Sequence, residues 1–77
     1  MNAERRKLLT DAETLLDQAR NLIEEARDAE QEAYDNLPES FQNGDKGQAM
    51  SEAIDNLEQA VSNVEDVVTA ISDARGE

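Results

Sequence analysis

Carboxylates crowd the middle of this 77-residue chain, and they are its most chemically distinctive side chains. Within residues 24–35, six acids face a single cation, Arg27, and three more acids follow at residues 52–58. Like charges four residues apart on a helix, such as Glu24 and Asp28, repel by about 0.2–0.5 kcal/mol. Two interpretations remain open: a solvated face that keeps a small bundle soluble, or a docking surface for a basic protein. The acidic set comprises Glu24, Glu25, Asp28, Glu30, Glu32, Asp35, Glu52, Asp55 and Glu58.

The remaining residue types argue against catalysis and against bound metals or cofactors. The chain has no His and no Cys, so a Glu-x-x-His di-metal site and a thiolate metal site are both excluded. Residues 43–47 contain glycines, but Lys46 and Ala49 stand where a calcium loop needs oxygen ligands. The four serines have no His to activate them as nucleophiles. We therefore predict no catalytic residue, no metal ligand and no cofactor.

The charge balance restricts the class of partner. The chain carries 19 acidic and 7 basic residues, a formal net charge of −12, and only 3% of its residues are aromatic. This negative net charge disfavours binding to nucleic acid and to anionic membranes, and it favours a basic protein as the partner. The longest apolar runs are two residues, far short of a membrane span, and no apolar run follows the cations of residues 5–7 as in a secretory signal. We expect a soluble cytoplasmic protein, in the host cytoplasm if a phage encodes it.

Helix-forming residues fill the first half of the chain without interruption. No Gly or Pro occurs from residue 3 to residue 36, and Ala, Leu, Glu and Arg dominate. Asn2 is the preferred N-cap, and a rival start is a capping box formed by Thr10 and Glu13. Pro38 pushes the preceding residue out of the helical region. We predict a first helix over about 3–36.

The second half is predicted to form a helix of similar length. Residues 37–47 hold the only Pro and two of the three Gly, so we predict a connector there, with one helical turn started by Pro38. Asp45 with Gln48 is interpreted as the cap of a helix over about 46–75, and Gly76 as its stop. Helices of similar length joined by a short connector favour an antiparallel hairpin. We expect residues 1–77 to form one all-α domain.

Apolar residues recur at heptad spacing in both predicted helices. Each helix carries three apolar columns in seven, as bundle helices do, whereas a two-stranded seam needs only two. A lone hairpin would leave much of these columns in water, so we expect two hairpins to form a homodimeric four-helix bundle. The residues predicted to form its core and dimer contact are Leu8, Leu9, Leu15, Leu16, Leu22, Ile23, Ile54, Leu57, Val61, Val64, Val67, Val68 and Ile71.

Three smaller features have alternative interpretations. Alanines at residues 12, 19, 26 and 33 either let the facing helix approach closely, which we favour because they lie on the apolar stripe, or supply helix propensity alone. The cations at residues 5–7 are a solubilising helix start, a nucleic-acid arm, or a contact for the acidic end of a second copy. Tyr34 and Phe41 are expected to cover the end of the bundle, and if exposed they are candidate binding hot spots.

The predicted connector and the end of the first helix also carry a family resemblance. The run EAYDNLPES at residues 32–40, with Ala53–Asp55, Leu57, Glu58 and Ala60, resembles small acidic two-helix proteins of bacteriophage and prophage genomes. Several phage proteins of this size and charge are counter-defence factors, including anti-CRISPR proteins, that occupy basic host surfaces. The resemblance implies such a role and assigns no functional residue.

We therefore expect a non-catalytic, DNA-mimicking inhibitor that blocks a nucleic-acid-binding surface of a host defence protein. Two copies would carry about −24 along roughly 50 Å of helix, or about one charge per 2 Å, close to the value for duplex DNA of about 1.7 Å. Two alternatives remain: a structural or assembly protein whose apolar stripe pairs with helices, and an antitoxin-like neutraliser of a basic toxin.

Overall fold

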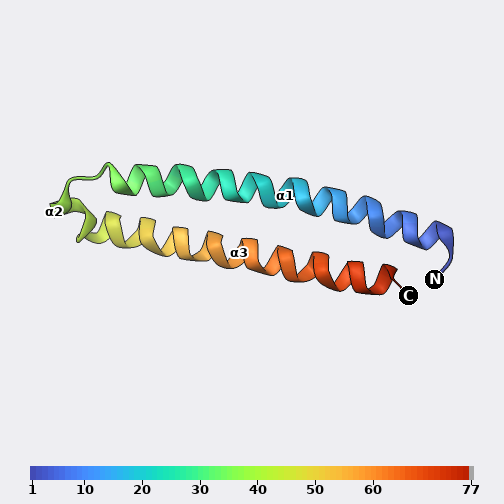
Figure 1. The fold of residues 1–77 in the computed structure, drawn as a ribbon. Coiled ribbons are helices and arrows are strands. Elements are labelled where there is room, and N and C mark those ends of the chain that lie inside the picture. Colours follow the sequence, from blue (N-terminus) through green and yellow to red (C-terminus); the bar gives the residue numbers. More distant parts are fainter. Residues whose placement is uncertain (77) are drawn as a thin grey trace.

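The computed structural model describes residues 1–76 as two long antiparallel helices joined by a helical turn (Figure 1). The long helices are α1 (Ala3–Asp35) and α3 (Asp45–Arg75), and the turn between them is α2 (Glu39–Gln42). Together they form a rod of 58 × 15 × 12 Å, in which the first turns of α1 extend past the end of α3 (Figure 1). The predicted all-α class is confirmed, and the long helices form the expected hairpin.

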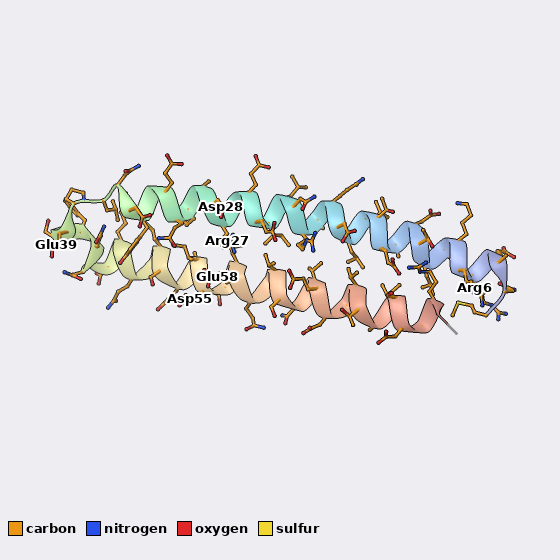
Figure 2. The ribbon with its side chains drawn as sticks, viewed as in Figure 1. Arg6, Arg27, Asp28, Glu39, Asp55 and Glu58 are labelled. Carbon is orange, nitrogen blue, oxygen red and sulfur yellow. The ribbon has the colours of Figure 1, made fainter. Side chains whose placement is uncertain are left out.

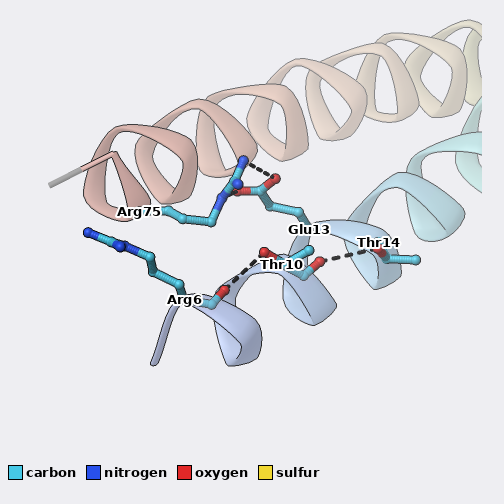
Figure 3. Close-up of polar contacts among 5 residues, drawn as sticks. All are labelled: Arg6, Thr10, Glu13, Thr14 and Arg75. Carbon is cyan, nitrogen blue, oxygen red and sulfur yellow. Dashed lines mark hydrogen bonds and ion pairs between the residues drawn. The ribbon is translucent and has the colours of Figure 1, made fainter. Parts of the chain in front are cut away.

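The start of α1 is set by Asn2. Its side-chain oxygen accepts a hydrogen bond of 2.9 Å from the backbone N–H of Arg5, which satisfies one of the free donors at the helix start. The rival start at Thr10 is wrong. Thr10 lies inside the helix and its hydroxyl donates to the carbonyl oxygen of Arg6 at 2.9 Å (Figure 3). The helix ends at Asp35, before the residues that Pro38 restricts.

The joint, residues 36–44 between α1 and α3, is held to the end of α1 by one side chain. Pro38 begins α2, and its carbonyl oxygen accepts the backbone N–H groups of Phe41 and Gln42 at 2.8 and 3.1 Å. The Nε2 of Gln42 donates to the carbonyl oxygens of Tyr34 and Leu37 at 3.1 and 3.2 Å. The Tyr34 carbonyl also accepts the backbone N–H of Leu37 at 3.1 Å. Gln42 adds a side-chain donor to the carbonyls at the end of α1 and so acts as a side-chain cap. The predicted turn at Pro38 is therefore present, and Gln42 fixes its position.

The start of α3 differs from the prediction. Its N-cap is Gly44 rather than Asp45, and no side chain caps it. Asp45 is the first helical residue, where its negative charge still favours the positive end of the helix dipole. Two residues later, Gly47 is buried against the joint. A Cβ at Gly47 would overlap the backbone of Gln42, with the Gln42 Cα only 2.6 Å away.

The packing line between the long helices has a small buried centre. Ile54 and Val61 of α3 are the buried apolar residues of the described chain, at 6% and 8% exposure. On α1, the half-buried apolar residues that face α3 are Leu9, Ala12, Leu16, Ala19 and Ile23. On α3, the half-buried apolar residues are Met50, Ala53, Leu57, Ala60, Val64, Val68 and Ile71. We call this packing line the seam.

The two long helices lie side by side and antiparallel along the seam (Figure 1). Near the open end of the rod, Arg75 of α3 binds Glu13 of α1. Its Nε is 3.0 Å from Oε1 and its terminal nitrogen is 3.2 Å from Oε2 (Figure 3). Such two-point pairs fix geometry as well as adding energy.

The seam uses one edge of the apolar stripe of α1 and leaves the other edge in water. Leu8, Leu15 and Leu22 are 65%, 65% and 67% exposed. The predicted close packing along the alanine column holds only at Ala12 and Ala19, because the alanines at residues 26 and 33 are exposed. A single neighbouring helix covers only part of so broad a stripe.

Replacing Gly47 with alanine tests the tight approach at the joint. Alanine gains about 1 kcal/mol of helix propensity over glycine, but forcing atoms into a filled site typically costs about 1–3 kcal/mol. We expect the overlap with the Gln42 backbone to dominate, so that Gly47→Ala lowers the free energy of unfolding measured with urea. In the control Gly76→Ala, the Cβ would lie 3.5 Å from the carbonyl oxygens of residues 72 and 73, an ordinary contact. Equal stabilities for the two variants would contradict this account.

Candidate protein-binding faces

The hairpin has two different faces, one on each side of the seam. Which face a residue lies on depends on whether it comes one position before or one position after a seam residue. Two antiparallel helices are related by a local two-fold axis perpendicular to their common plane. Equal offsets from the seam therefore project on the same side of the hairpin. One residue along a helix is a rotation of about 100°. Residues immediately before seam positions share one face, and residues immediately after them share the opposite face.

The face before the seam positions is apolar. On α1, Leu8, Leu15 and Leu22 precede Leu9, Leu16 and Ile23. On α3, Val67 precedes Val68, and Ala53 and Ala60, which lie at the edge of the seam, precede Ile54 and Val61. Val67 is 45% exposed, and the three leucines are about two-thirds exposed. The exposed alanines at residues 26, 29, 33 and 74 extend the same two lines. We call these residues the apolar face. Exposed apolar surface of this continuity is typical of protein contacts.

The face after the seam positions is acidic. On α1, Asp17 and Glu24 follow Leu16 and Ile23, and Asp28 is one turn beyond Glu24. On α3, the acids that follow seam positions in this way are Asp55, Glu58 and Glu65. Together these six acids define the acidic face, and Figure 2 labels three of them, Asp28, Asp55 and Glu58.

Arg27 lies among these acids and partly neutralises them. Its terminal nitrogen and Nε are 2.9 and 3.2 Å from Oδ1 of Asp28, and the guanidinium lies between the helices near Glu58 (Figure 2). The hydrogen bond and charge of Asp28, with smaller contributions from Glu58 and Glu24, raise the pKa of Arg27 above its usual value. Arg27 therefore keeps its charge throughout the neutral pH range. Arg20 contributes a second, looser contact, with its Nε 4.0 Å from Oε1 of Glu24.

The nine predicted acidic residues do not all lie together. Glu24, Asp28, Asp55 and Glu58 lie on the acidic face, whereas Glu30 is half-buried at the seam. The exposed side chains of residues 25, 32 and 52 project from other sides of their helices. Asp35 lies at the end of α1, where its Oδ1 accepts a hydrogen bond of 2.9 Å from Gln31.

The predicted core residues divide between the seam and the apolar face. Leu8, Leu15, Leu22 and Val67 are exposed in the single hairpin, and the other nine are buried or half-buried. Of the two aromatic residues, Tyr34 is half-buried, whereas Phe41 is 57% exposed at the joint. Phe41 therefore does not cover the end of this hairpin.

Sequence reasoning missed two polar contacts that set the geometry. The Arg75–Glu13 pair joins positions 62 residues apart, and Gln42 reaches back to α1 from the joint. The sequence could have predicted the first pair, because an Arg in the last turn of an antiparallel hairpin lies near acids in the first turns of the other helix. Nothing in the local sequence distinguishes Gln42 from the other glutamines.

No family model, curated protein or solved structure matches the chain. Within residues 1–76, no helix has both the length and the apolar content needed to cross a bilayer. The same residues form no metal-binding group of acids and no pocket.

Removing the charge of Arg27 tests the electrostatics of the acidic face. In Arg27→Gln, the carboxylates of Asp28, Glu24 and Glu58 lose their shared cation and repel one another. We expect a lower melting temperature at low salt, measured by circular dichroism, and a smaller loss in high salt, where exposed charges are screened. The control Lys46→Gln removes a cation outside this face and should change the melting temperature less. A loss for Arg27→Gln that does not depend on salt would contradict the electrostatic explanation.

Proposed function

We propose that this chain is a non-catalytic protein-binding protein that acts as a homodimer and presents acidic surfaces to a basic partner. One observation carries the proposal: the apolar face and the acidic face lie on opposite sides of the hairpin. Two copies that pack through their apolar faces form a four-helix bundle and leave both acidic faces outward. The same contact therefore completes the core and displays the charge.

The exposed area of the single hairpin supports a second copy as the occupant of the apolar face. The chain exposes 5501 Å², whereas a compact monomer of 8.5 kDa exposes about 4,700 Å². The excess of roughly 800 Å² is about the area that each partner buries in a standard protein interface. The rod thus has surplus surface of the size that a stable dimer needs.

Electrostatic repulsion does not oppose this packing strongly. Each hairpin is 12 Å across its thinnest dimension, so the two outward acidic faces stand roughly twice that distance apart. This separation exceeds the Debye length of about 8 Å at physiological salt. Burial of each leucine of the apolar face contributes roughly 1.5–3 kcal/mol, which is large compared with the screened repulsion.

The charge density of such a dimer fits a surface that normally holds nucleic acid. Two chains of −12 each along a rod of 58 Å give about one charge per 2.4 Å, compared with about 1.7 Å for duplex DNA. Together with the resemblance of the joint to acidic phage proteins, this density supports an inhibitor that occupies a basic surface of a host defence protein. A structural role is the second candidate, because the exposed leucines would equally suit the helices of another assembly protein.

The dimer is tested by replacing two leucines of the apolar face. We expect the melting temperature of the wild-type chain to rise with protein concentration, because association stabilises the folded state by mass action. In Leu15→Gln/Leu22→Gln that dependence should disappear and the melting temperature should fall. The control Asn21→Gln/Glu25→Gln changes two exposed residues elsewhere on α1 and should behave like the wild type. A wild-type melting temperature that is independent of concentration would contradict the dimer.

The docking proposal is tested by neutralising two acids of the acidic face, Glu24 and Asp28, together with Glu32 one turn beyond them. We expect Glu24→Gln/Asp28→Asn/Glu32→Gln to lose binding to basic proteins from a heparin-retained bacterial fraction. Proteins bound to the wild-type chain should be released by duplex DNA and by about 0.5 M salt, because screening weakens exposed charge contacts. The control Glu4→Gln/Asp66→Asn/Asp73→Asn makes the same change in net charge at the other end of the rod, at exposed acids outside the acidic face. If the first variant binds the same proteins as the wild type, the docking proposal is wrong.

A further inference from the structure

We infer that the two copies pack with their rods opposed, so that the joint of each lies beside the open end of the other. In this arrangement, which rests on the proposed dimer, α1 packs on α1 and α3 on α3, both antiparallel. The two-fold axis passes between residues 20 and 21 of α1. Three features support this orientation: the sizes of the side chains on α1, the sizes of those on α3, and the charge along the rod.

The apolar face of α1 has a large half and a small half. Leucine occupies residues 8, 15 and 22, and alanine occupies residues 26, 29 and 33. In the opposed arrangement, Leu8 meets the partner's Ala33 and Leu15 meets the partner's Ala26. Leu22 meets the partner's Ala19, at the edge of the seam. Each leucine therefore packs against an alanine, which places large side chains against small ones.

The apolar face of α3 has its own centre of symmetry, close to the same level of the rod. Its residues are Ala53, Ala60, Val67 and Ala74, and opposed pairing places Ala60 on the partner's Val67 and Ala53 on the partner's Ala74. The centre of this pattern lies between residues 63 and 64. The contacts of Arg27 with Glu58 and of Arg75 with Glu13 place that point beside residues 21–25 of α1, within about one helical turn of the axis on α1. A two-fold axis near this point is therefore compatible with both helices.

The charge along the rod favours the same orientation. The half that contains the joint, residues 21–63, has 11 acids and 2 cations, a net charge of −9. The open half, residues 1–20 and 64–77, has 8 acids and 5 cations, a net charge of −3. Opposed rods place each −9 half beside a −3 half, and bring the cations of residues 5–7 to the partner's acidic joint. Like charges in close apposition would destabilise the contact.

The alternative two-fold arrangement aligns the joints and packs α1 on the partner's α3. Leu15 would then face the partner's Val67, and Leu8 and Leu22 would face alanines. Near the joint, Ala29 would face the partner's Ala53. The layers would be smallest near the joint, and the two −9 halves would lie together. Both consequences disfavour aligned joints.

Disulfide mapping tests the orientation, because the chain has no native cysteine. Leu8→Cys and Ala33→Cys chains are mixed, unfolded and refolded together, and oxidised in a glutathione buffer. Opposed rods bring residue 8 of one chain to residue 33 of the other, and keep the two copies of residue 8 about 37 Å apart, far beyond disulfide reach. We expect the mixed 8–33 product to dominate. The control mixture of Asn21→Cys with Ala33→Cys, in which residue 21 lies outside the apolar face, should form little product.

The outcomes separate the orientation from the dimer itself. Dominant 8–8 and 33–33 products would overturn the opposed orientation and leave the proposed dimer standing. The 8–8, 8–33 and 33–33 products in statistical proportions would overturn it as well, because they indicate no fixed orientation. A wild-type chain that elutes with the mass of one chain by light scattering would overturn both the dimer and the orientation.

Discussion

The apolar stripe of α1 is wider than the surface that one neighbouring helix covers, and the rest of the structure depends on this mismatch. The neighbour α3 covers the line from Leu9 through Leu16 to Ile23, but it leaves Leu8, Leu15 and Leu22 about two-thirds exposed. The described residues contain only two buried apolar side chains, Ile54 and Val61. A core of this size is small for a chain near the lower limit of independent folding. Packing against a second copy would supply the missing part of the core.

The same pattern that sets the apolar face also sets the charge. A seam residue, its predecessor and its successor point to three sides of a helix, so the triplets Leu15–Leu16–Asp17 and Leu22–Ile23–Glu24 place apolar, packed and acidic residues in fixed order. Such repetition over several turns gives a rod that is apolar on one side and acidic on the other. In the proposed dimer, self-association and partner binding would therefore use different surfaces.

The sequence was sufficient to predict the features that depend on helix propensity, on capping residues and on the spacing of apolar residues. Uninterrupted helix formers, the cap at Asn2 and the break at Pro38 placed both long helices and the turn between them. The sequence did not reveal which column of the broad stripe of α1 faces α3, because Leu8 and Leu9 are equally apolar. That choice depends on tertiary contacts, including the tight approach at Gly47 and the pairing of Arg75 with Glu13. For the same reason, local spacing grouped Glu30 with the other acids although it lies at the seam.

Sedimentation equilibrium of the wild-type chain at micromolar concentration tests the central claim most directly, because it measures mass without any substitution or label. The account predicts a mass of about 17 kDa, twice the 8.5 kDa of one chain, with dissociation on dilution. A mass of 8.5 kDa that persists across the concentration range, in a chain that circular dichroism finds fully helical, would contradict it. In that case the exposed leucines need no second copy, and the hairpin is stable alone.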